Sequence, residues 1–212
     1  MSIGLLGTKL GMTQLFNDAG NALPITLLQV GPCMITQIKD TKSHGYEAIQ
    51  IGYYECNYNK LTKPETGHLN KVGAPSFRYL KEYRVKSIKE FNVGQNITVN
   101  QLKIGYKVNI SGLSIGKGFT GYQKRHNFSR GPMTHGSKNH RQPGSIGAGT
   151  TPGRVFPGKR MAGRMGHNKV TVKNLQIIDI NIDKHLVIVK GSVPGKPGNL
   201  ISINYKQKTK ND

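Results

Sequence analysis

The hydrophobic residues of this chain gather into short runs on both sides of a long polar segment. The runs cover residues 24–30, 33–39, 48–54 and 107–110 before the segment, and residues 170–178, 185–190 and 199–205 after it. They are rich in Val, Ile and Leu, and Gly, Pro and Asn separate them. Short strands joined by such turns predict a mainly β body, either a barrel or a sandwich.

Two local signals refine this prediction. Gly31-Pro32 is a turn signal between the first two runs. Residues 63–71 predict a short helix, with Thr62 as its N-cap and with Pro64 and Glu65 near its start.

The polar segment between the runs, residues 116–168, is called the basic loop below. Its 53 residues include 12 Gly and only 11 apolar or aromatic residues, whereas the other 159 residues hold 64. The loop therefore cannot build a core of its own. Because strands are predicted on both sides of it, we expect an excursion from one closed body and not a linker between two domains. A segment of this kind typically becomes ordered on a partner.

The net charge indicates what that partner is. The chain has 31 Lys or Arg against 10 Asp or Glu, a formal charge of +21. Positive charges in such excess repel one another unless a polyanionic partner neutralises them. The partner is therefore expected to be nucleic acid or an anionic membrane surface. No stretch approaches the roughly 18 apolar residues of a membrane span, and the glycine-rich loop offers no amphipathic basic helix for a membrane surface. These features favour nucleic acid over a membrane.

The position of the charges strengthens this interpretation. Between Glu90 and Asp179 lie 88 residues without a carboxylate, and they include 14 Lys or Arg. Six of the eight arginines fall within residues 124–164, whereas lysine predominates elsewhere. Guanidinium groups grip phosphate with two hydrogen bonds and stack on bases. The loop is therefore predicted to pack closely on RNA or DNA.

Cofactor and metal chemistry find little support. Residues 116–121 fit the G-x-G-x-x-G pattern, but we predict no amphipathic helix after them, and no acid follows about 20 residues on. Two cysteines, Cys33 and Cys56, form neither a disulfide framework nor a four-ligand zinc site. We predict no cofactor, no metal site and no small-molecule substrate.

An enzyme remains an alternative at this stage. His135, Lys138 and His140 would be the candidates for acid–base cleavage or modification of RNA. We favour a role for the loop histidines in stacking on and hydrogen bonding to RNA. Four aromatic residues lie among these basic residues: Phe119, Tyr122, Phe128 and Phe156. They would either stack on unpaired bases or anchor the loop against the protein's own body.

Longer motifs carry a family resemblance. A set of positions falls at the spacing of a known signature: Leu102, Asn109, Gly112, Ser114, Gly116, Lys117, Gly118, Gly121 and Arg125. The opening residues 4–16 and the loop segments 131–137, 143–147, 151–156 and 159–166 match as well. Over essentially its whole length, the chain resembles the bacterial-type family of large-subunit ribosomal protein three.

The resemblance implies a translation-protein-type β-barrel with a small inserted region, and a long, largely irregular basic extension loop. Residues 1–115 would form the first part of the barrel, with the insertion around residues 55–90. Residues 116–168 would be the extension, and residues 169–212 would complete the barrel and form the tail.

The same resemblance implies a structural constituent of the large ribosomal subunit and no enzyme. It would bind 23S-type rRNA, act early in assembly and extend its loop towards the peptidyl-transferase centre, beside neighbours such as large-subunit proteins fourteen and nineteen. Some bacterial relatives carry a methylated glutamine at the loop apex. Residues 148–151 hold none here, so that modification should be absent.

We predict that rRNA contacts the basic side chains of the loop and the adjoining Lys169. The predicted rRNA-binding residues are Lys117, Lys124, Arg125, Arg130, His135, Lys138, His140, Arg141, Arg154, Lys159, Arg160, Arg164, His167 and Lys169. The bacterial-type motifs, the lack of a transit-peptide pattern and the 23 Lys, 19 Ile and 17 Asn typical of AT-rich coding DNA favour a ribosome in the plastid (chloroplast) stroma. A bacterial cytoplasm is the alternative.

Overall fold

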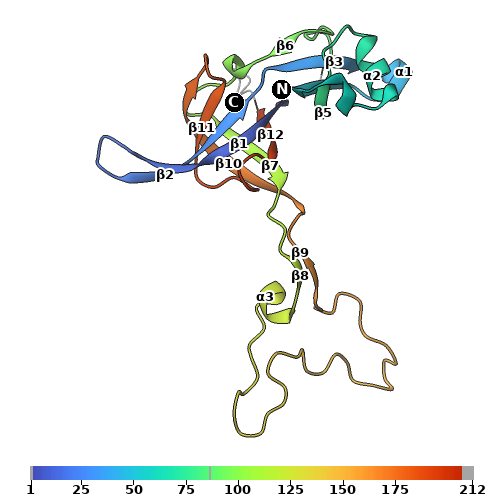
Figure 1. The fold of residues 1–212 in the computed structure, drawn as a ribbon, viewed down its shortest axis with the longest axis vertical. Helices are drawn as coiled ribbons and strands as arrows, with labels where there is room; N and C mark the ends of the chain where they lie inside the picture. The colour runs from blue at the N-terminus through green and yellow to red at the C-terminus, as the bar shows by residue number, and fades with distance from the viewer. Residues whose placement is uncertain (1, 86, 207–212) are drawn as a thin grey trace. The chain divides into compact units, whose positions relative to one another are not determined.

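The computed structural model describes residues 2–85 and 87–206. The chain separates into two compact units: the first is formed by the residues before and after the segment Ser114–Asn168, and the second is that segment itself. The first unit contains a closed barrel with the strand order β1-β12-β7-β10-β11-β2, all antiparallel (Figure 1). Its strands are β1 (Ser2–Phe16), β2 (Ala22–Val30), β7 (Lys107–Leu113), β10 (Lys169–Asn181), β11 (Leu186–Lys190) and β12 (Leu200–Lys206). The prediction of a mainly β barrel is confirmed.

A second sheet of the first unit has the order β5-β4-β3-β6. Its strands are β3 (Cys33–Lys39), β4 (Ala48–Glu55), β5 (Phe77–Arg84) and β6 (Asn96–Ile97), and the short helices of this region are α1 (Thr41–His44), η1 (Tyr58–Lys60), α2 (Lys63–Asn70) and η2 (Val99–Gln101). The hydrophobic runs at residues 33–39 and 48–54 thus belong to this sheet and not to the barrel. The hydrophobic runs at 33–39 and 48–54 looked like barrel strands because a strand's pattern records burial and not which sheet it joins.

The helix predicted at residues 63–71 is confirmed as α2. The Glu65 carboxylate accepts hydrogen bonds from the backbone N–H of Thr62 at 2.9 Å and from its hydroxyl at 2.8 Å. This contact fixes the N-terminal turn. Leu69 is buried and packs in a small cluster with Ala74 and Phe77. The helix thereby covers part of the second sheet.

Strand β1 was not predicted, and its glycines are the reason. A Cβ atom at Gly7 would overlap the carbonyl oxygen of Gln29 in β2. A bulge between Lys9 and Gly11 then shifts the register of β1 against β2. Glycine in a strand commonly marks such a close approach or bulge. From sequence alone, however, a segment this rich in glycine resembles a series of turns, and the strand was therefore not predicted.

One hydrophobic core serves both sheets. Leu28, Ile177 and Ile203 of the barrel share a cluster of fully buried side chains with Ile35 and Ile49 of the second sheet. Because the two sheets bury their faces in the same cluster, we describe them as one body.

A buried lysine of β1 bonds to the segment between β11 and β12. The side chain of Lys9 is only 7% exposed, and its ammonium group donates to the carbonyl oxygens of Val193 at 2.8 Å and Gly195 at 2.9 Å. Burial lowers the pKa of this lysine.

Among the described residues, no helix is both long and apolar enough to cross a membrane.

Candidate nucleic-acid interface

The unit Ser114–Asn168 begins as an antiparallel ribbon. Strand β8 (Gly118–Thr120) pairs with β9 (Gly163–Met165) (Figure 1). The backbone N–H of Ser114 donates to the carbonyl of Asn168 at 2.9 Å and thereby extends the ribbon towards its base. Gly166 has φ +75°, and a Cβ atom there would overlap the carbonyl of Ile115. Glycine at position 166 therefore lets the two sides of the ribbon lie this close to each other.

A short helix, α3 (Tyr122–His126), follows the ribbon directly. It ends at Asn127, which takes the left-handed conformation. Tyr122 stacks on Phe128 with 5.9 Å between ring centroids. The sequence predicted no helix here, because five residues show no amphipathic period. A single turn and a half of helix also differs from the long helix that follows a dinucleotide-binding glycine motif.

Beyond α3 the chain contains no further helix or strand before β9. Local hydrogen bonds shape it instead. The N–H of Gly131 donates to the carbonyl of His140 at 3.1 Å, and the N–H of Gly153 donates to that of Gly149 at 3.0 Å. The His140 Nδ1 lies 2.9 Å from the carbonyl oxygen of Pro132. Turn contacts of this kind leave most side chains directed to solvent.

Burial and charge separate this unit from the body. Thr120 is the single buried residue between Ser114 and Asn168. Twelve of the predicted rRNA-binding side chains are exposed: Lys117, Lys124, Arg130, His135, Lys138, Arg141, Arg154, Lys159, Arg160, Arg164, His167 and Lys169. Both ion pairs found among the described residues join other parts of the chain. The loop therefore presents positive charge without internal neutralisation.

The remaining two predicted residues, Arg125 and His140, are half-buried. The Arg125 Nη1 donates to the carbonyl oxygen of Met161 at 2.6 Å, and the His126 Nε2 lies 2.9 Å from the same oxygen. Arg125 thus also anchors α3 to the irregular segment that leads into β9. Sequence alone did not distinguish this structural use from an RNA contact.

The predicted residues do not converge on one point. Lys117, Lys124 and Arg141 line a common cleft, whereas the others are distributed along the loop. Among the residues that the structure describes, no group of three His, Cys, Asp or Glu side chains is placed to hold a metal ion.

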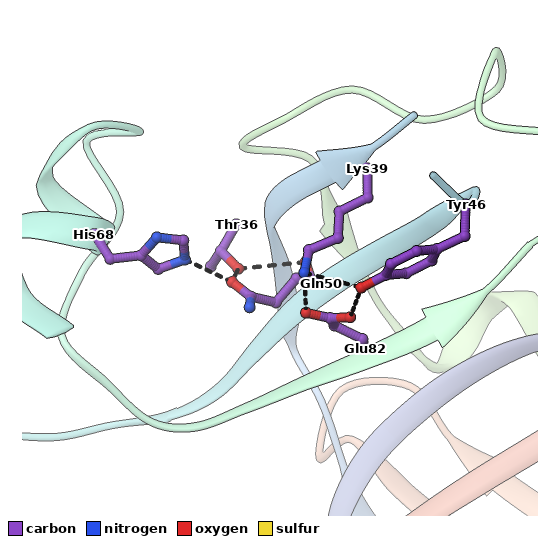
Figure 2. Close-up of polar contacts among 6 residues, drawn as sticks. All are labelled: Thr36, Lys39, Tyr46, Gln50, His68 and Glu82. Atoms are coloured by element: carbon purple, nitrogen blue, oxygen red, sulfur yellow. Dashed lines mark hydrogen bonds and ion pairs between the residues drawn. The ribbon is translucent and has the colours of Figure 1, made fainter. Parts of the chain in front are cut away.

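A second polar cluster lies in the other unit, on the sheet β5-β4-β3-β6. Figure 2 shows Lys39 and Tyr46 directed at the carboxylate of Glu82. The Lys39 ammonium is 2.5 Å from the Glu82 Oε1, and the Tyr46 hydroxyl donates to the Glu82 Oε2 at 2.9 Å. These hydrogen bonds lower the pKa of Glu82, and the carboxylate raises the pKa of Lys39.

The same cluster continues through Gln50. Its Oε1 accepts from the Thr36 hydroxyl at 2.9 Å and lies 2.7 Å from the Nε2 of His68, which belongs to α2 (Figure 2). Every side chain drawn here has a partner within the cluster. It ties α2 and three strands together, and we interpret it as structural.

Known proteins resemble the chain along nearly its whole length. The family described as Ribosomal protein L3 matches residues 84–186. A protein of Gracilaria tenuistipitata var. liui, "Large ribosomal subunit protein uL3c", is 65% identical over 203 residues, which are 96% of this chain and 99% of that protein.

The chain belongs to the ribosomal protein L3 family.

Further members of the ribosomal protein L3 family agree. The uL3c protein of Porphyra purpurea is 61% identical over 96% of this chain and 100% of its own length. The uL3 protein of a Synechococcus strain is 60% identical over 96% of this chain and 95% of its own length. The resemblance inferred from the sequence motifs is confirmed. Membership makes this chain a ribosomal protein, a structural component and not an enzyme, and its uL3c relatives are of plastid type.

Proposed function

We propose that this chain binds large-subunit rRNA through the basic loop and thereby helps to shape the large subunit of a plastid ribosome. The observation that carries the proposal is the surface of the loop, where exposed cations stand among residues that include no carboxylate. Each Lys or Arg that meets a phosphate releases condensed counterions, which favours binding.

RNA suits this surface better than a generic polyanion. Phe119 is 80% exposed and Phe156 is 61% exposed, and both offer a face on which an unpaired base can stack. Sequence-specific RNA recognition commonly uses unpaired bases stacked on aromatic and guanidinium planes. The mixture of arginine and exposed phenylalanine supports contact with folded RNA that contains such bases.

The family resemblance supports finer proposals. The body formed by residues 1–115 and 169–212 holds residues 116–168, and this loop extends towards the peptidyl-transferase centre. The chain joins the subunit early in assembly, and large-subunit proteins fourteen and nineteen are among its neighbours. The ribosome that contains it works in the plastid stroma.

Two arginines of the loop provide the test. Arg141 and Arg154 are exposed, so their replacement by Ala should leave the body folded. We expect the double variant to melt like the wild type but to give fewer mature large subunits, or subunits with slower peptide transfer. The matched control replaces Lys42 and Lys71, two exposed cations of the body. Equal melts with normal subunit profiles and normal peptide transfer would contradict the proposal.

A further inference from the structure

A cleft of about 310 Å³ lies within the unit Ser114–Asn168, where β8 meets α3. Its lining includes Phe119 from β8, Gln123 and Lys124 from α3, and Lys117 and Arg141 from the flanking chain. Small-ligand sites usually occupy ~300–1,000 Å³. The cleft is therefore large enough for one nucleotide and too small for a stretch of duplex.

The charges around the cleft favour an anion. Lys117, Lys124 and Arg141 come from three separate places in the sequence, and the fold brings them to one site. No carboxylate occurs between residues 91 and 178 to neutralise them, and none of the three forms an ion pair among the described residues. Three cations without a counter-charge fit a phosphate group.

An unpartnered amide gives a second, independent indication. The side-chain Nε2 of Gln123 is buried, and no acceptor lies within hydrogen-bond distance of it among the residues that the structure describes. A buried donor without a partner costs free energy, and most such groups in folded proteins are satisfied. Because Gln123 lines the cleft, a turn of its side chain that exposes Nε2 would let a ligand there with an oxygen or ring-nitrogen acceptor supply the missing partner.

An aromatic face completes the site. Tyr122 also lines the cleft, but its ring already stacks on Phe128. Phe119 is 80% exposed and stacks on no other aromatic ring among the described residues. A free aromatic ring beside cations is the arrangement on which unpaired bases stack.

We propose that this cleft binds a single unpaired nucleotide of the rRNA. Its phosphate contacts Lys117, Lys124 and Arg141, its base stacks on Phe119, and the Gln123 amide donates to one of its acceptors. This inference rests on the proposed rRNA binding and deepens it, because it assigns one point of the loop to a nucleotide held away from its neighbours. The remaining loop cations then contact the RNA backbone at the exposed positions described above.

The test uses the full chain and three probes: adenosine 5′-monophosphate, adenosine and inorganic phosphate. The side-chain amide signals of glutamine in nuclear magnetic resonance spectra report on Gln123 directly, and Gln123→Leu identifies its signal. We expect the monophosphate to shift this signal and to bind about tenfold more tightly than either adenosine or phosphate, because the site uses both the base and the phosphate. Phosphate binding as tightly as the monophosphate, or an unmoved Gln123 signal, would overturn the proposal.

Two matched pairs of variants localise the effect. Phe119→Ala and Gln123→Leu should each weaken monophosphate binding about tenfold, since one removes the stacking face and the other the donor. Phe16→Ala and Gln142→Leu change the same residue types at exposed positions that do not line the cleft, and we expect them to bind like the wild type. An equal loss in both pairs would contradict the assignment of the cleft.

The same variants separate this inference from the proposed function. None of the four substitutions changes the net charge, so the salt dependence of rRNA binding should stay as in the wild type. A chain that binds the monophosphate in the cleft but not rRNA would refute the proposed function and leave the cleft assignment standing. A chain that binds rRNA with steep salt dependence while the Gln123 signal stays unmoved would refute the cleft alone.

Discussion

The ring of Tyr83 lies directly against Gly4, so closely that a Cβ atom at position 4 would overlap the ring. Tyr83 belongs to β5 of the second sheet, and Gly4 belongs to β1 of the barrel. The Tyr83 hydroxyl also forms a buried hydrogen bond of 2.6 Å with the hydroxyl of Ser202 in β12. One tyrosine therefore packs on the barrel and bonds to it, and the bare backbone of Gly4 makes this possible.

Gly4→Ala should destabilise the body by about 1–3 kcal/mol, because the added methyl group must displace the ring or the strand. Gly11→Ala is the control: it lies in the same strand, and a Cβ atom there meets nothing within 4 Å. We expect the control to change stability by no more than about 1 kcal/mol. Guanidinium unfolding measures both, and equal free energies of unfolding for the two variants would contradict the packing described.

The two cysteines should differ in reactivity. Cys33 is fully buried, and burial raises the pKa of its thiol to about 12. Because the thiolate is the reactive form, we expect iodoacetamide at about pH 8 to modify the half-buried Cys56 first and Cys33 only after unfolding. Peptide mass spectrometry before and after guanidinium treatment shows which thiol carries the label. Labelling of Cys33 in the folded protein at the rate of Cys56 would show that the core is open.

Glu82 should make a small, pH-dependent contribution to stability. Its pKa lies below the usual 4.5, chiefly because Lys39 donates a hydrogen bond to it. The contribution is therefore present above that value and is lost as the pH falls through the lowered pKa. Since the Glu82 side chain is 35% exposed, the pair contributes at most about 1 kcal/mol.

Glu82→Gln should accordingly be less stable than the wild type near about pH 7, and the difference should shrink as the pH falls below about 4. Thermal melts across this range measure the difference. Glu90→Gln is the control, because Glu90 is exposed and forms no ion pair among the described residues. A gap between wild type and Glu82→Gln that stays constant with pH would contradict the ion pair.

The sequence predicted the barrel and the helix α2 because both carry strong local signals. Buried strands show as β-branched runs, and α2 shows its start through Thr62, Pro64 and Glu65. Strand β1 was not predicted, because its residues Gly4 and Gly7 are placed by close contacts with residues far away in the sequence. Close approach between segments far apart in the chain leaves no local pattern.

The candidate site was also predicted only in part from the sequence. The cations and aromatic residues of the loop were identified from the sequence, since a carboxylate-free basic segment is visible without a structure. Which of the aromatic residues are exposed was not predicted, because Tyr122 and Phe128 are half-buried and stack on each other. Gln123 was missed because an uncharged amide in a basic segment carries no signal of its own. Its significance comes from its side-chain Nε2, which is buried without a partner among the described residues, at a cleft that Lys117 and Arg141 also line. Only the folded loop reveals this arrangement. Arg125 shows the converse, because part of its bonding capacity is used inside the protein.

The salt dependence of rRNA binding tests the central claim most directly. If all eleven predicted lysine and arginine residues contact phosphate, the slope of log K against log salt concentration reaches about −10, which is the steepest value expected. We expect replacement of five exposed loop arginines by Gln (Arg130, Arg141, Arg154, Arg160 and Arg164) to reduce the steepness of this slope by about 4. Replacement of five exposed body lysines by Gln (Lys42, Lys60, Lys63, Lys71 and Lys103) removes the same charge and should change the slope by less than about 1. Equal changes for the two sets, or a wild-type slope near about −1, would contradict the basic loop as the surface that binds RNA.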